Sequence, residues 1–199
     1  MVMAVGKREP LSVRDWTEAA LEALACGGLA AVAVEPLAKS LGATKGSFYW
    51  HFTDRNALLR ATLELWERRD TDQVLAGIDE TQDGATRLHN LVELALLSVQ
   101  RDAEAGVGSI ELALQASASH PLVASTLQRV TSRRIAALSD LYATLGLSRA
   151  GARDHALLAY TAYLGHVQLA HATPGLLPRG RAFRRHVDRL VDVLVTVES

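Results

Sequence analysis

Apolar residues recur at spacings of three and four along nearly every segment after Pro10, and this pattern predicts a chain built from helices. Segments that alternate apolar and polar residues, as strands do, are scarce. Only five prolines occur among 199 residues, which also favours helices. Because 49% of the residues are hydrophobic, a chain of this length can bury a substantial core. The expected fold class is therefore all-α.

The composition and the short apolar runs exclude several classes of protein. A single cysteine, Cys26, cannot build a disulfide framework or a multi-cysteine metal cluster. The formal net charge of -1 argues against a uniformly basic surface but allows a local basic patch. The N-terminal residues lack an apolar signal core, and the apolar stretches are too short or too interrupted to span a bilayer. We therefore expect a cytoplasmic protein with no cofactor, no metal and no membrane partner.

Capping residues and glycines divide the first sixty residues into three short helices that lead into a longer one. Ser12 can cap the first helix, with Asp15 three residues on as the acidic half of a capping box. Similar signals predict helices from Ser12 to Gly27, Pro36 to Gly42, Thr44 to Phe52 and Asp54 to about Ala76. Beyond Gly77, we expect helices near residues 84–104, 107–118, 121–145, 149–172 and 180–197.

The stretch from Val34 to Phe52 predicts a helix-turn-helix. Two tightly packed helices need a small residue where they cross, a turn residue that tolerates positive φ, and an apolar anchor on the second helix. Ala38, Gly42 and Phe48 supply these three features, and Phe52 shares the inner side with Phe48. The outer surface of the second helix then carries Thr44, Lys45, Ser47, Tyr49, Trp50 and His51, with Gly46 between them.

This outer surface has the chemistry of a nucleic-acid contact. Lys45 and His51 can donate to phosphates, and the hydroxyl groups can contact phosphates or base edges. Gly46 lets the backbone approach a duplex closely, and Arg55 in the next helix adds a phosphate contact. The alternative is an ordinary surface helix, which the density of aromatic and hydroxyl residues disfavours. The candidate DNA-binding residues are Thr44, Lys45, Gly46, Ser47, Tyr49, Trp50, His51 and Arg55.

The stretch from Val13 to Leu59 resembles the DNA-binding domain of the TetR family of transcriptional regulators. The run from Gly42 to Phe52 carries most of this resemblance, together with Arg55 and Leu58. It implies that the short helix enters the DNA major groove and that Tyr49 and Arg55 bind phosphates. It also implies a homodimer and a C-terminal helical domain that binds a small effector. We expect a DNA-binding domain at residues 1–56 and an effector-binding and dimerisation domain at residues 57–199.

Several positions depart from the family pattern. Ala33 stands where relatives commonly have a hydroxyl residue, and Arg55 replaces the usual lysine. Glu9 and Glu35 place negative charge near the expected DNA side. Residues 1–60 contain seven Lys or Arg and six Asp or Glu, so DNA affinity must come from the arrangement of charges. Tight binding by a monomer is not expected.

The segment from Ala156 to Ala172 is apolar almost around its circumference, whereas a surface helix of a monomer should have a polar side. The last helix also carries an apolar stripe. We expect these two helices to pair with their counterparts in a second chain; the alternative is that both belong to the core of one chain. The candidate dimer residues are Leu158, Ala162, Gly165, Leu169, Val187, Leu190, Val191 and Leu194.

An effector pocket is expected among the middle helices, where polar and aromatic residues are mixed with aliphatic ones. Each such residue can instead be an ordinary core or interface group. The candidates are Trp66, His89, Gln100, Gln115, Tyr142, Tyr160, Tyr163 and His166.

Together these patterns predict a ligand-responsive DNA-binding regulator. We expect a repressor that binds a palindromic double-stranded DNA operator as a homodimer and is released by an unknown small-molecule effector. One alternative is a helical dimeric enzyme, but the sequence contains no HExxH, GxSxG or Walker-type phosphate loop, so an enzyme is not expected. The other alternative is a small-molecule-binding or dimerisation protein that binds no operator.

Overall fold

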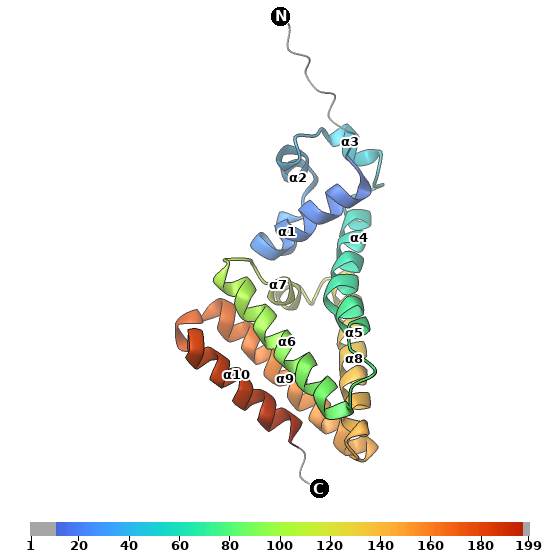
Figure 1. The fold of residues 1–199 in the computed structure, drawn as a ribbon. Helices are drawn as coiled ribbons and strands as arrows, with labels where there is room; N and C mark the ends of the chain where they lie inside the picture. The colour runs from blue at the N-terminus through green and yellow to red at the C-terminus, as the bar shows by residue number, and fades with distance from the viewer. Residues whose placement is uncertain (1–10, 197–199) are drawn as a thin grey trace, which may run out of the picture.

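The computed structural model describes residues 11–196, and within that range the chain forms ten α-helices and no β-strand. The all-α prediction is therefore confirmed. Figure 1 shows a small group of helices, α1 to α3, at one end and a larger helical bundle at the other, with α4 running between them. The helices are α1 (Val13–Ala31), α2 (Val34–Ser40), α3 (Lys45–Tyr49), α4 (Arg55–Glu67), α5 (Gln73–Ala76), α6 (Gly84–Glu104), α7 (Ile110–Ala116), α8 (Pro121–Thr144), α9 (Arg149–Ala172) and α10 (Gly180–Val195).

The predicted caps begin the N-terminal helices. At α1 the Ser12 hydroxyl accepts from the Asp15 backbone N–H, and the Asp15 carboxylate accepts from the Ser12 backbone N–H, at 3.3 and 2.7 Å. Thr44 and Asp54 cap α3 and α4 in the same way. These contacts satisfy backbone donors that the first helical turn leaves free. The starts of these three helices were thus predictable from single residues.

Two N-terminal helices end differently from the prediction. Gly28 adopts φ 65° and kinks α1, but a further helical turn follows and α1 ends at Ala31. Helix α3 ends at Tyr49 rather than near Phe52, because the chain turns there toward the cap of α4. The stretch from Thr44 to Phe52, which the sequence predicted as one helix, is therefore a five-residue helix followed by a turn.

The long helix predicted from Asp54 to about Ala76 is correct in extent but is not regular. It consists of α4, a π-helical segment at Arg68–Asp72, and α5. A π-helical turn widens the backbone and is frequent at functional sites. This segment changes which side chains face the bundle.

The C-terminal helices match their predicted ranges closely, although α7 is shorter than residues 107–118 and α10 ends at Val195. Residue 197, where the last helix was expected to end, lies outside the described residues. Helices α6, α8, α9 and α10 form the bundle, and α10 lies along α6 (Figure 1). No helix in the described part of the chain is both long enough and apolar enough to cross a membrane.

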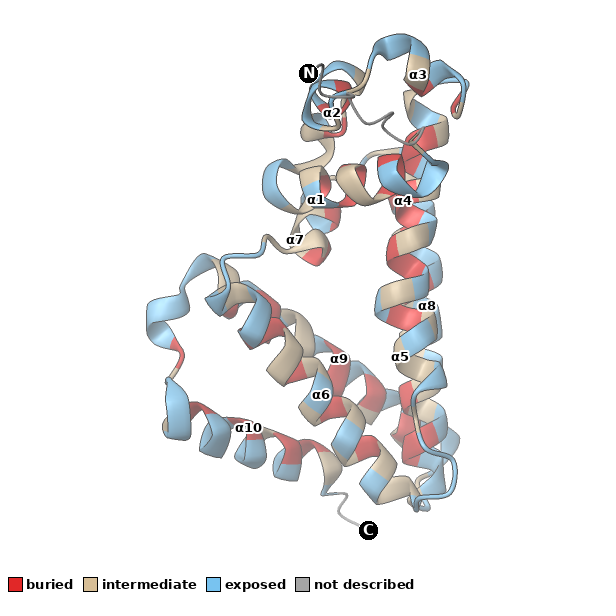
Figure 2. Ribbon diagram, turned by 45° about the horizontal axis from the view of Figure 1, so that its top comes forward, coloured by how far each residue is buried: buried red, intermediate tan, exposed pale blue. Residues whose placement is uncertain are grey.

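Buried side chains form two main clusters. Figure 2 colours the buried residues red along the helices that carry them. The first joins α1 to α4 around Trp16 and Phe48, and it also takes in Leu114 of α7 and Val123 of α8. The second fills the space between α6, α8, α9 and α10. Because Leu59 of α4 belongs to the first cluster, α4 packs with the N-terminal helices as well as leading into the bundle.

Candidate nucleic-acid interface

Phe48 fixes the orientation of α3. Its side chain is fully buried, with its ring edge-on to Trp16 and stacked on Phe52, both at 5.4 Å between centroids. Ala38 is buried where α2 meets α3, and Gly42 has φ 62° in the turn. The sequence prediction of a tight helix pair built on these residues is confirmed.

The opposite side of the α3 segment faces solvent. Trp50 is 87% exposed and Tyr49 is 61% exposed, which is unusual for large aromatic side chains on a monomer surface. Thr44, Lys45 and Gly46 are also exposed, whereas Ser47 and His51 are half-buried. The Thr44 hydroxyl accepts from the Ser47 backbone N–H at 3.2 Å, so it helps begin the helix. The predicted DNA-binding residues of this segment therefore lie together, and their roles toward DNA stay predictions.

Lys45 forms an ion pair with Glu35 of α2. The hydrogen bond raises the pKa of Lys45 and lowers that of Glu35. Both side chains are mostly exposed, so solvent screens the pair and it is weak. Glu35 therefore competes with any phosphate for the Lys45 ammonium group.

Arg55 has a structural contact that the sequence did not indicate. Its guanidinium group donates to the backbone carbonyl of Val32 at 2.5 Å and to that of Leu29 at 2.6 Å. The side chain thus satisfies carbonyl groups at the end of α1 and joins them to the start of α4. No local sequence signal could have shown a contact across more than twenty residues. Its predicted phosphate contact would have to use the remaining N–H groups.

Residues 17–74 match the family model of bacterial regulatory proteins of the tetR family. The N-terminal domain of the chain is therefore of the TetR type. The match covers α2, α3 and α4 together with most of α1, which are the helices that hold Phe48 inward and Tyr49 outward. The resemblance to the TetR family predicted from the residues between Val13 and Leu59 is confirmed.

Solved structures share the fold of this chain over almost its whole length. A transcriptional regulator from Rhodococcus sp. Rha1 is 19% identical, with a TM-score of 0.71 over 93% of this chain and 94% of that one. The fatty acid degradation regulator FadR from Bacillus halodurans is 17% identical, with a TM-score of 0.68 over 95% and 97%. BioQ bound to its natural double-stranded DNA operator is 22% identical, with a TM-score of 0.51 over 93% and 98%. A search among curated proteins finds no match.

The chain also contains a cavity of about 560 Å³ bounded by α1, the π-helical segment, α6, α7, α8 and α9. Its size is typical of small-molecule sites. Two of the eight predicted effector residues, Tyr160 and Tyr163, line it. Among the described residues, no group of three His, Cys, Asp or Glu side chains is placed to hold a metal ion.

The other six predicted effector residues do not line this cavity, so that part of the prediction is wrong for it. Trp66 is buried in the first cluster, and the Tyr142 hydroxyl donates to the Leu194 carbonyl at 2.6 Å. Gln100 donates to Glu104, and His166 packs beside the Phe183 ring. His89 is half-buried near Glu93, and Gln115 is exposed near Glu111. Sequence periodicity cannot separate residues lining a cavity from those that fill a core.

Sequence reasoning missed a group of charged residues on the cavity wall that comes from α8, α7 and the π-helical segment. Arg134 of α8 pairs with Glu111 of α7 at 2.8 Å, and both side chains are largely buried. Arg134 also donates to the Thr71 hydroxyl at 3.0 Å, and Asp70 lies next to it on the π-helical segment. The sequence predicted a regular helix from Asp54, which gave no indication that Asp70 and Thr71 lie on the cavity wall. No other sequence signal marked these residues.

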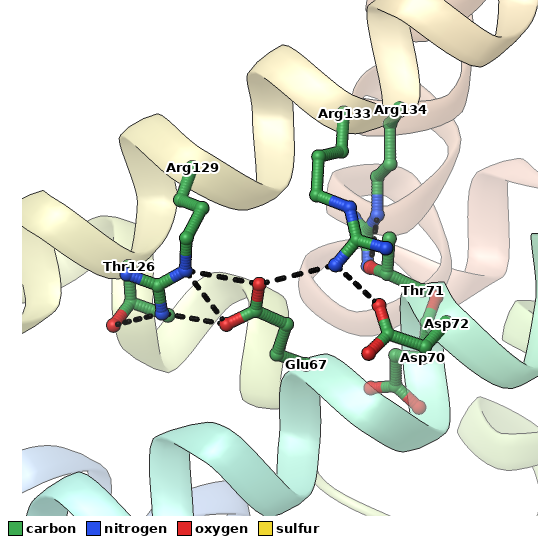
Figure 3. A network of polar contacts seen from close by, with 8 residues as sticks. All are labelled: Glu67, Asp70, Thr71, Asp72, Thr126, Arg129, Arg133 and Arg134. Atoms are coloured by element: carbon green, nitrogen blue, oxygen red, sulfur yellow. Dashed lines mark hydrogen bonds and ion pairs between the residues drawn. The ribbon is translucent and has the colours of Figure 1, made fainter.

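A second set of ion pairs joins α4 to α8 (Figure 3). Glu67 accepts from Arg129 through both carboxylate oxygens, at distances between 2.5 and 3.0 Å, and lies 3.5 Å from Arg133. Arg133 also pairs with Asp72 at 2.6 Å. The hydrogen bonds from Arg129 lower the pKa of Glu67. These contacts connect the helix that follows the DNA-binding segment to the bundle.

The predicted dimer residues divide into two groups. Leu158, Gly165 and Leu169 are exposed on α9, and Ala162 and Leu190 are half-buried. Val187, Val191 and Leu194 of α10 are at most 4% exposed because they pack in the second cluster of the same chain. Assigning these three to a dimer interface was therefore wrong: the apolar stripe of α10 packs within its own chain.

Proposed function

We propose that this chain is a TetR-family regulator that binds a palindromic DNA operator as a homodimer and leaves it when a small effector binds. One observation carries the DNA-binding part: Phe48 anchors α3 from inside, while Tyr49 and Trp50 project into solvent from the same segment. An exposed helix held this firmly can fit into a major groove with little loss of conformational entropy.

The exposed face of α9 supports the homodimer. Leu158 is 57% exposed and Leu169 is 40% exposed, with the side-chain-free Gly165 on the surface between them. An apolar stripe with a small residue permits the close approach of a second helix. A two-fold dimer places two α3 helices on half-sites about one helical turn of DNA apart, so two modest contacts reinforce each other.

The cavity supports control by an effector. Its wall includes Leu21 and Ala25 of α1, together with Thr71 of the segment that follows α4. A ligand bound there would touch helices of the DNA-binding part directly. For release, the ligand must prefer a conformation in which the two α3 helices are misplaced for the operator. DNA must then weaken ligand binding by the same factor.

The proposal also assigns a role to each domain and states that the protein represses transcription. Residues 1–56 serve DNA binding, and residues 57–199 serve effector binding and dimerisation, with α4 packing against both. A dimer seated on an operator blocks polymerase by occupying the site, so repression needs no additional contact surface. Activation would require such a surface.

Selection of bound sequences from random genomic fragments, at a stated salt concentration, tests this proposal. We expect imperfect palindromes, and we expect Tyr49→Ala and Lys45→Ala to abolish their recovery. Arg149→Ala, which removes an exposed charge at the start of α9, is the matched control and should recover the same sequences. If no common DNA sequence is recovered but the protein still binds a small molecule, the result would instead support a small-molecule-binding protein without an operator.

A further inference from the structure

The cavity wall is mainly apolar, but the Asp70 carboxylate lies on it without an ion-pair partner among the described residues. Apolar side chains such as Leu21, Val99 and Val167 come from α1, α6 and α9. Asp70 reaches the wall from the π-helical segment, and its side chain is exposed to the cavity. Among the described residues it forms no ion pair, and Figure 3 draws no contact to its carboxylate.

The arginine nearest to this carboxylate is already engaged. Arg134 pairs with Glu111 at 2.8 Å, donates to the Thr71 hydroxyl at 3.0 Å and contacts the Asp70 backbone carbonyl at 3.3 Å. Its guanidinium group also lies 5.4 Å from the ring centroid of Trp66 and 5.8 Å from that of Tyr163. Glu111 neutralises its charge, so Arg134 is not free to bind an anionic ligand.

The sum of charges around the cavity is negative. Its lining contains four carboxylates and two guanidinium groups, and the second arginine, Arg101, lies 3.7 Å from Asp102 at an exposed position. Burial raises the pKa of Asp70 to about 6, so its carboxylate is ionised at pH 7.5. A negative charge inside a mostly apolar cavity attracts a cation, because the surroundings screen it less than bulk water does.

We propose that the cavity binds an apolar molecule carrying a protonated amine, with the ammonium group against the Asp70 carboxylate. This inference rests on the proposed function, since it names the chemical class of the effector. The hydrocarbon part lies against the aliphatic side chains of α1 and α6. The stacked rings of Tyr160 and Tyr163, with centroids 6.0 Å apart, add an aromatic surface to the same wall. The ammonium thereby binds in the segment that joins α4 to α5.

Isothermal titration of the full chain with three ten-carbon probes tests the charge preference. The probes are decylamine, decanol and decanoate, each below its micelle concentration, at pH 7.5 and without DNA. We expect decylamine to bind about tenfold or more tightly than decanoate, because a charge-assisted hydrogen bond forms only with the cation. Asp70→Asn should bring the affinity for decylamine to within about threefold of that for decanol.

Asp140→Asn is the matched control, since it removes the same charge from an exposed position on α8 that does not line the cavity. It should change the decylamine affinity less than about twofold, because water screens that charge. An equal loss of decylamine affinity in both variants would overturn the proposal, because it would show that the ammonium group responds to the overall negative charge and not to a contact with Asp70. Equal or tighter binding of decanoate, an unchanged affinity in Asp70→Asn, or no binding of any probe would also overturn it.

DNA binding by the same preparation separates this inference from the proposed function. A protein that recovers palindromic DNA but prefers decanoate refutes only the ligand class. A protein that prefers decylamine through Asp70 but recovers no DNA refutes the operator-binding proposal and leaves the cavity assignment standing.

Discussion

Replacing Asp70 with asparagine should stabilise the protein at neutral pH. Burial raises the pKa of Asp70 from 3.8 to about 6, which means that the folded state disfavours the ionised carboxylate. At about 1.36 kcal/mol per pKa unit, the full shift corresponds to a penalty of about 3 kcal/mol. The side chain is exposed to the cavity, and screening there reduces this to roughly 1–2 kcal/mol. Asparagine has nearly the same shape and carries no charge, so it removes the penalty.

The sign of the pH dependence follows from the raised pKa. Below pH 3.8 the carboxyl is protonated in both the folded and the unfolded chain, and no penalty exists. The penalty grows between pH 3.8 and about 6 and stays constant above that range. The stabilisation by Asp70→Asn should therefore be full at pH 7.5 and fall to about a third at pH 4.5.

Urea denaturation of the wild type and of Asp70→Asn at the two pH values measures this effect. At pH 7.5 we expect a gain of roughly 1–2 kcal/mol, or about 2–8 °C in melting temperature. Asp140→Asn, at an exposed position on α8 outside the cavity, should change stability by less than about 0.5 kcal/mol. A gain that does not depend on pH, or a loss of stability at pH 7.5, would refute the reasoning.

Three other substitutions test the remaining contacts. Glu67→Gln should lower the free energy of unfolding by roughly 1–2 kcal/mol at pH 7, since Arg129 is half exposed. Because Arg129 lowers the pKa of Glu67, this deficit should shrink once the pH falls below 4.5, the ordinary pKa of Glu, and should vanish below the lowered pKa of the folded state. A deficit independent of pH in urea denaturation would count against this pairing. Phe48→Ala should cost about 3–5 kcal/mol in thermal or urea denaturation, and a loss below about 1 kcal/mol would mean that Phe48 does not anchor α3. Arg55→Lys should lower the free energy of unfolding by about 1 kcal/mol, because the carbonyl contacts are lost, but it should keep the salt dependence of DNA binding. Arg55→Ala should in addition reduce the slope of log DNA affinity against log salt concentration by about one. An unchanged slope in Arg55→Ala would contradict the phosphate role of Arg55.

The helix-turn-helix could be predicted from the sequence because its signals are local. Ser12, Thr44 and Asp54 mark helix starts through contacts only three residues away. Gly42 and Phe48 likewise fulfil requirements that any tight helix pair must meet. Such features depend on the identity of single residues and not on the rest of the fold.

The cavity and the use of α10 could not be predicted in this way. Asp70 reaches the cavity from a π-helical segment, and the periodicity of a regular helix gives no sign of that change. Val187 and Val191 form an apolar stripe that would suit a partner chain as well as α6. Only the arrangement of the bundle decides between these two uses, because the hydrophobic effect is not directional.

Photo-crosslinking from position 50 tests the central claim most directly. Trp50 is replaced by the photoreactive p-benzoylphenylalanine, and Leu158 is replaced by the same residue in a separate protein. After irradiation with operator DNA, position 50 should crosslink to DNA, and position 158 should crosslink to a second copy of the chain. A crosslink from position 50 to the second copy, or none to DNA, would contradict the claim that α3 is an exposed probe for a DNA groove.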